Sequence, residues 1–126
     1  MATVETEVYD VLRNAAAVTA LCPAARIKPP GNWQNLTRSY IVHFPVALRQ
    51  ARTHDGLKGR LWDSYQVSVF ADDYTSGRNL ADAVVAALDG VSAGGANFQF
   101  QSLRVFQDPE VNVIHFVLEF LCGETL

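Results

Sequence analysis

The chain has 126 residues, of which 49% are hydrophobic and 18% are charged. That length suits one domain, and that composition supplies a hydrophobic core and excludes a disordered chain. The formal net charge of −3 is the sum of two unlike parts. Residues 26–60 have a net charge of +6 and the remainder has −9, so the surface can attract nucleic acid or another copy of the chain. The basic residues of that stretch are Arg26, Lys28, Arg38, Arg49, Arg52, Lys58 and Arg60, against one acid, Asp55.

The sequence also excludes membrane and secretory classes. No run approaches the roughly 18 uninterrupted apolar residues of a membrane span. The first ten residues carry three acids and no basic segment, unlike a secretory signal. Two cysteines, Cys22 and Cys122, are too few for a secreted disulfide scaffold, so we expect reduced core thiols in a cytosolic protein. The sequence leaves a bridge between them open.

The first elements in chain order are a helix and two strands. Apolar residues from Val4 to Ala15 recur at helical spacing, which predicts an amphipathic helix over about residues 3–20. Residues 26–28 predict an edge strand that runs into a Pro-Pro-Gly turn, and residues 32–38 predict a loop. Residues 40–44 are rich in β-formers and predict a strand that Pro45 ends.

The most regular strand pattern covers residues 58–71. Residues 47–56 before it are polar and basic, with a turn signal at His54-Asp55-Gly56. One face is predicted to be buried, because five apolar residues share one parity: Leu61, Tyr65, Val67, Val69 and Ala71. The opposite face is largely polar but includes Trp62 and Phe70.

The second half predicts a helix and two more strands. Asp72-Asp73 precedes a helix with an apolar stripe from Leu80 to Leu88, and Gly90 stands at its C-terminal end. Residues 92–96 predict a loop, and strands follow near 97–106 and 111–121. The last strand is apolar on nearly both faces, so we expect it at the sheet centre or beneath a partner chain. The fold class is α+β, an antiparallel sheet of about four strands with two helices packed on one face.

Catalytic patterns are missing from the sequence. The histidines, His43, His54 and His115, stand in different elements without metal-ligand spacing, and we expect His43 and His115 to be satisfied sheet residues. Neither cysteine has a setting that lowers a thiol pKa. No glycine-rich loop matches a phosphate or dinucleotide site. We therefore predict no enzyme, no catalytic, metal-binding or cofactor-binding residue, and no cofactor.

Two features remain to be explained. The basic stretch is either a solvated face or a nucleic-acid footprint, but no base-reading or stacking motif accompanies it. Trp62 and Phe70 lie on the polar face of a strand whose other face is buried, so that face is covered by the chain's own loops or by another subunit. Eight of the ten basic residues are arginine, and arginine and aromatic residues are enriched at interfaces.

The order of the motifs resembles a known family. The series consists of Ala20-Leu21-Cys22-Pro23, Arg26-Ile27-Lys28-Pro29, the strand 40–44, His54-Asp55-Gly56, and the strand 65–71 leading to a helix that closes at 86–90. Over nearly the whole chain it resembles the tail completion proteins of long-tailed bacteriophages, also called tail terminators or tail-to-head joining proteins. The resemblance implies one tail-terminator-like domain over residues 1–126, in a hexameric ring that caps the head-proximal end of the tail tube. Such a ring stops tube polymerisation and provides the surface for head-tail joining.

The resemblance also sets the expected partners and location. It implies a virion protein at the head-proximal end of the tail, assembled in the host bacterial cytoplasm, that contacts its own copies, the tail tube protein and a head completion or connector protein. It brings no catalytic residue, and we expect neither a membrane nor specific nucleic-acid recognition.

A ring uses heterologous contacts, in which one surface meets a different surface of the next copy. We therefore expect basic and acidic portions to meet at a subunit interface, and the competing placement turns the basic residues toward the tube or the connector. Six residues are expected at or beside the subunit or partner interface: Arg49, Arg52, Lys58, Arg60, Trp62 and Phe70. The alternative function is a nucleic-acid-binding accessory protein that uses residues 26–60. A small-molecule enzyme with its site in the groove between sheet and helices ranks last.

Overall fold

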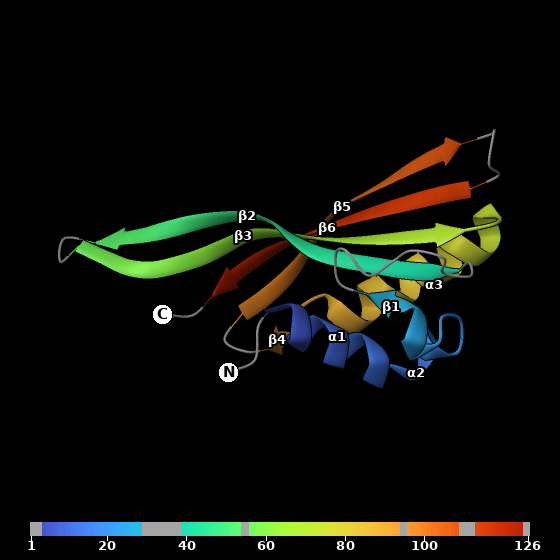
Figure 1. The fold of residues 1–126 in the computed structure, drawn as a ribbon, viewed down its shortest axis with the longest axis horizontal. Coiled ribbons are helices and arrows are strands. Elements are labelled where there is room, and N and C mark those ends of the chain that lie inside the picture. Colours follow the sequence, from blue (N-terminus) through green and yellow to red (C-terminus); the bar gives the residue numbers. More distant parts are fainter. Residues whose placement is uncertain (1–3, 29–38, 54–55, 94–95, 109–112, 125–126) are drawn as a thin grey trace.

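The computed structural model describes residues 4–28, 39–53, 56–93, 96–108 and 113–124. These form one sheet of strand order β1-β2-β3-β6-β5-β4, with the helices beneath one face (Figure 1). The strands are β1 (Ile27–Lys28), β2 (Tyr40–Thr53), β3 (Gly56–Ala71), β4 (Ser92–Ala93), β5 (Ala96–Asp108) and β6 (Val113–Glu124). The helices are α1 (Val4–Asn14), α2 (Ala16–Thr19) and α3 (Tyr74–Leu88), with a short 3₁₀ turn, η1, at Ala24–Arg26.

The α+β class and the one-sided helical layer are confirmed. Four strands are long and mutually antiparallel, while the two-residue strands β1 and β4 stand at the edges. β1 runs parallel to β2 as the expected edge strand, and β4 occupies part of the segment predicted as a loop. The predicted loop 32–38 and two residues of the predicted turn at 54–56 lie outside the described residues.

The N-terminal helix is divided rather than continuous. Ala15 has an extended backbone, with φ −86° and ψ 109°, between α1 and α2. The break redirects the chain so that Val18 and Cys22 are buried in the same core as Val8 and Leu12. Periodicity could not reveal this break, because residues 15–17 are all alanine, the residue that most favours a helix.

The ends of α3 match the sequence signals. The Asp73 side chain accepts a hydrogen bond from the Ser76 backbone N–H at 2.8 Å, which caps the first turn. This bond and one from the Ser76 hydroxyl lower the pKa of Asp73. Gly90 follows the helix with a φ of 76°, in the left-handed region that glycine adopts without strain.

Pro45 does not end β2, and that prediction was wrong. The strand continues to Thr53, and the register with β3 shifts between Pro45 and Ala47. β1 pairs with β2 only at Ile41 and Val42, so Pro45 lies on a sheet edge next to a bulge. Edge strands and bulges both tolerate a residue that lacks an N–H group.

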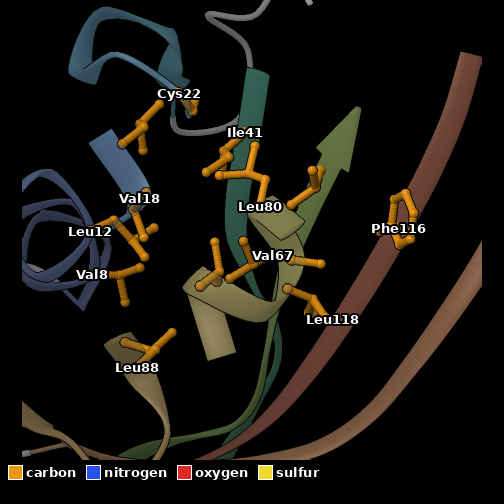
Figure 2. Packing of buried hydrophobic residues seen from close by; sticks show 14 of the residues in the cluster. Val8, Leu12, Val18, Cys22, Ile41, Val67, Leu80, Leu88, Phe116 and Leu118 are labelled. Atoms are coloured by element: carbon orange, nitrogen blue, oxygen red, sulfur yellow. The ribbon is translucent and has the colours of Figure 1, made fainter. Parts of the chain in front are cut away.

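The core lies between the helices and one face of the sheet (Figure 2). The odd-numbered residues of β3 from Tyr65 to Ala71 are fully buried there, as the alternation predicts. β6 pairs with β3 on one side and β5 on the other, so its predicted central place is confirmed. None of the helices among the described residues has the length and hydropathy needed to cross a membrane.

Candidate subunit interface

Residues 47–53 and 56–62 form a two-stranded ribbon that we call the arm. Its β2 and β3 segments pair with each other from Ala47 to Trp62. Pairing of β3 with β6 begins only at Ser64, and no other strand pairs with the arm within the described part of the chain. The arm extends beyond the helices and beyond β5 and β6 (Figure 1). It therefore offers two unpaired strand edges.

The arm holds five of the six predicted interface residues. The β2 segment contains Arg49 and Arg52, and the β3 segment contains Lys58, Arg60 and Trp62. The structure does not describe their side chains, so these residues are placed by the backbone register alone. The sixth predicted residue, Phe70, lies in the body of the sheet.

The positive charges of the arm are not matched across the hairpin. Arg49 pairs with Leu61, and Arg60 pairs with Gln50. Arg52 pairs with Leu57. None of these arginines has a carboxylate at its cross-strand position, the place where opposite charges stabilise a sheet. The backbone register therefore places no acid opposite any of these three arginines.

Two bulges separate the arm from the body. Tyr65 pairs with Pro45 and Ser64 with Ala47, but Trp62 pairs with Leu48. One extra residue on each strand, Val46 and then Asp63, interrupts the alternation. Bulges bend strands and increase their twist. The parity that placed Trp62 on the face of Phe70 therefore does not carry through this point.

The basic stretch of the sequence is divided in space. Arg26 and Lys28 belong to η1 and β1, beside Ile41 and Val42 at the start of β2. The arm begins only after the bulges. Arg38 lies outside the described residues. Arg26 and Lys28 thus belong to another part of the sheet than the basic residues of the arm.

The sheet face opposite the helices, which we call the open face, carries a row of aromatic rings. Phe70 stacks on Tyr40 with ring centroids 4.8 Å apart and on His115 at 4.2 Å. The ring centroid of Phe106 lies 6.1 Å from that of His115. The four residues occupy paired positions on β2, β3, β6 and β5. The row thus crosses all four long strands.

The polar groups of the open face are largely satisfied within it. Arg104 forms a 2.8 Å ion pair with Glu119, and Gln66 donates a hydrogen bond to Ser68 at 2.9 Å. A shallow hollow of about 210 Å³ lies beside the row, lined by Val42, Phe44, Gln66, Ser68, Phe70 and His115. A protein partner that covers this face would bury its apolar side chains, among them Phe106, which is 53% exposed.

The aromatic row is a poor platform for nucleic-acid bases. Base stacking needs a free ring face. Phe70 already has Tyr40 and His115 stacked against it at interplanar angles of 19° and 13°. Arg104, on the same face, is neutralised by Glu119. The open face therefore fits an apolar protein surface better than a nucleic acid.

The candidate catalytic groups do not form a site. His43 faces the helices and its Nδ1 lies 2.7 Å from the Tyr65 hydroxyl, the kind of partner expected for a structural sheet residue. His115 lies on the opposite face of the sheet, so the two imidazoles cannot share a ligand. The Nε2 of His115 is buried without a hydrogen-bond partner among the described residues, and burial lowers the pKa of His115. The sequence predicts that His115 is hydrogen-bonded within the sheet, and for Nε2 this is not so among the described residues.

The thiol of Cys22 is unsuited to nucleophilic chemistry. Burial raises the pKa of Cys22 to about 11, although the nearby Arg26 charge opposes this. The thiol lies 3.7 Å from the Ser39 carbonyl oxygen, a weak hydrogen bond. A thiol with that pKa is protonated at neutral pH and unreactive. The side chain of Cys122 lies outside the described residues.

Comparison with known proteins agrees with this arrangement. The model of the family described as "Tail completion protein gp17" matches residues 6–122. The chain belongs to the tail completion protein gp17 family. A solved chain from the "Virion of native gene transfer agent (GTA) particle" has the same fold, with a TM-score of 0.78 and 21% identity over 97% of this chain and 95% of that chain. No curated protein matches the sequence.

As a member of this family, the protein is a structural component of a phage-like virion. The family that the order of motifs resembles is therefore the correct one, and virion assembly is the correct class of function. The aromatic row of the open face was not predicted from the sequence. Phe70 and His115 were visible in their strands, but their contact depends on the pairing register of β3 with β6.

Proposed function

We propose that this tail completion protein forms a ring that caps the head-proximal end of the tail tube. The ring stops tube polymerisation and provides the surface for head-tail joining. Membership of the tail completion family carries this proposal. The similar fold of a chain from a gene transfer agent virion supports a place in a phage-like particle.

The shape of the subunit suits such a ring. A cyclic assembly needs two different contact surfaces on each copy. The arm offers one, with four basic residues and two free strand edges. The open face offers a second, apolar surface in the body, with Phe106 53% exposed and Leu121 44% exposed. We propose that the residues of the arm, together with Phe70 between the stacked rings of Tyr40 and His115, are parts of the subunit or partner interface.

Removal of the gene from the parent particle tests the function. We expect tails of irregular length and heads without tails in electron micrographs, because neither tube capping nor head joining takes place. Expression of the intact chain from a plasmid is the control and restores joined particles. Antibody labelling of restored particles places the protein at the head-tail junction. Uniform tails joined to heads without the protein would contradict the proposal.

A further inference from the structure

Among the residues that the structure describes, no helix or further strand supports the arm. It is a two-stranded ribbon from Ala47 to Trp62, and β6 joins the sheet only at Ser64. A hairpin of two strands is marginally stable in water, because it has no second surface to pack on. Contact with another chain would therefore stabilise the arm.

The chemistry of that surface follows from the arm's charge. Four basic residues and one acid, Asp55, lie between positions 47 and 62. The register places Leu61, Gln50 and Leu57 opposite the three arginines. The complement to a ribbon with this excess of basic residues is a surface with free carboxylates.

The helical layer has carboxylates of two kinds. Asp10 is paired with Arg13 at 2.9 Å, and Asp82 is paired with Arg78 at 3.0 Å. These acids are neutralised by their own helices. They leave little net charge for a partner.

Glu7 and Asp89 differ, because neither has an ion pair within the described part of the chain. The residues next to them, Val8 and Leu88, lie near each other in the core (Figure 2). Glu7 and Asp89 therefore lie at the same end of the helical layer, which we call the acidic end. Asp89 is exposed and accepts the Phe100 backbone N–H at 2.8 Å through one oxygen.

We propose that the arm of one copy docks on the acidic end of the next copy. Each copy then gives one arm and receives one, a head-to-tail contact that closes into a ring. This inference rests on the proposed ring function and names the surfaces that form it.

Paired charge changes test the contact. The arm variant carries Arg52→Glu and Arg60→Glu. The end variant carries Glu7→Lys and Asp89→Asn, in which the side-chain amide oxygen at position 89 still accepts the Phe100 N–H. The control variant, Arg13→Glu with Arg78→Glu, changes the net charge as much as the arm variant but alters neither surface. Native mass and sedimentation of each variant, at low and high salt, give the assembly state.

We expect the intact chain and the control variant to assemble. The arm variant alone and the end variant alone should each need a protein concentration at least about tenfold higher to assemble. An equal mixture of arm and end variants should assemble, because the altered arm then meets the altered end in an alternating ring. Added salt should weaken every assembly. Circular dichroism shows whether each variant is folded.

Assembly of the arm variant like that of the intact chain would overturn the inference, as would a mixture that fails to assemble. An intact chain that stays monomeric at about 0.1 mM would also overturn it. Such a result leaves the proposed function standing, because a ring can close on the tube itself. Normal tails after removal of the gene would instead remove the proposed function.

Discussion

Gly77 lies at a close contact between α3 and the sheet. A Cβ at this position would overlap the ring of Phe116 and approach the Cβ of Ala71 to 2.9 Å. Phe116 is fully buried and cannot move aside. The absence of a side chain at Gly77 therefore lets the helix lie close to the central strand.

We expect Gly77→Ala to destabilise the protein by about 1–3 kcal/mol. At an exposed helical site the same change would stabilise by about 0.5–1 kcal/mol, so the sign itself is informative. Urea unfolding measures the difference. Asn79→Ala, at an exposed position of α3, is the control and should have little effect. A stabilised Gly77→Ala variant would show that the helix lies farther from β6 than described.

His115 predicts a pH dependence of stability. Burial holds its pKa below the ordinary value of 6.5, so the unfolded chain takes up a proton at higher pH than the folded chain. The free energy of unfolding therefore decreases as the pH falls from about 6.5 through the lower pKa that His115 has in the folded chain.

The variant His115→Gln isolates that effect, because the other two histidines are the same in both proteins. We expect the stability of the native chain to fall more steeply than that of the variant between pH 7 and pH 5. Thermal unfolding across this range measures it, and an NMR titration gives the pKa directly. If stability fell equally steeply with pH in the two proteins, the imidazole of His115 would not be neutral and buried as described.

At the scale of elements, β6 holds the sheet together. Leu118 is fully buried at the sheet centre, between β3 and β5. We expect Leu118→Ala to cost about 2–5 kcal/mol, because it leaves a cavity in the core. Val105→Ala on β5 is the control, since Val105 is 44% exposed, and should stay within about 0.5 kcal/mol. Chemical denaturation of both variants compares them, and similar losses would argue against a central β6.

The arm should be separable from the body. Replacing residues 48–62 with a short Asn-Gly turn leaves the pairing of β3 with β6 from Ser64 onward. We expect the shortened chain to fold cooperatively, because the described core lies between the helices and the body of the sheet. Circular dichroism and thermal unfolding check the fold, and native mass checks assembly, which should be lost. Loss of folding would make the arm part of the core.

At the scale of the whole molecule, one face of the sheet has helices and the other has none among the described residues. This asymmetry predicts protection of the open face on assembly. Hydroxyl-radical footprinting should show Phe106 and Leu121 reactive in the free chain and protected in the particle. Tyr74, exposed at the start of α3, is the control and should keep its reactivity. Unchanged reactivity of Phe106 in the particle would place the open face outside every interface.

The secondary structure followed from local physics in most places. The alternation in β3, the cap at Asp73 and the glycine at Gly90 depend on neighbouring residues, so the sequence was enough to predict them. The continuation of β2 through Pro45 and the break at Ala15 were missed. Both depend on what packs beside the chain, which no local pattern contains.

The sequence by itself determined the α+β class, the unequal division of charge and the resemblance to tail completion proteins, because composition and the order of motifs are properties of the chain alone. Only the tertiary structure decided how these are placed. Pairing register joined Tyr40, Phe70, His115 and Phe106 into one row, and two bulges divided the basic stretch into an arm and a body portion. The physical reason is that strand pairing brings together residues far apart in the sequence, so surface charge and apolar area acquire a direction only on folding.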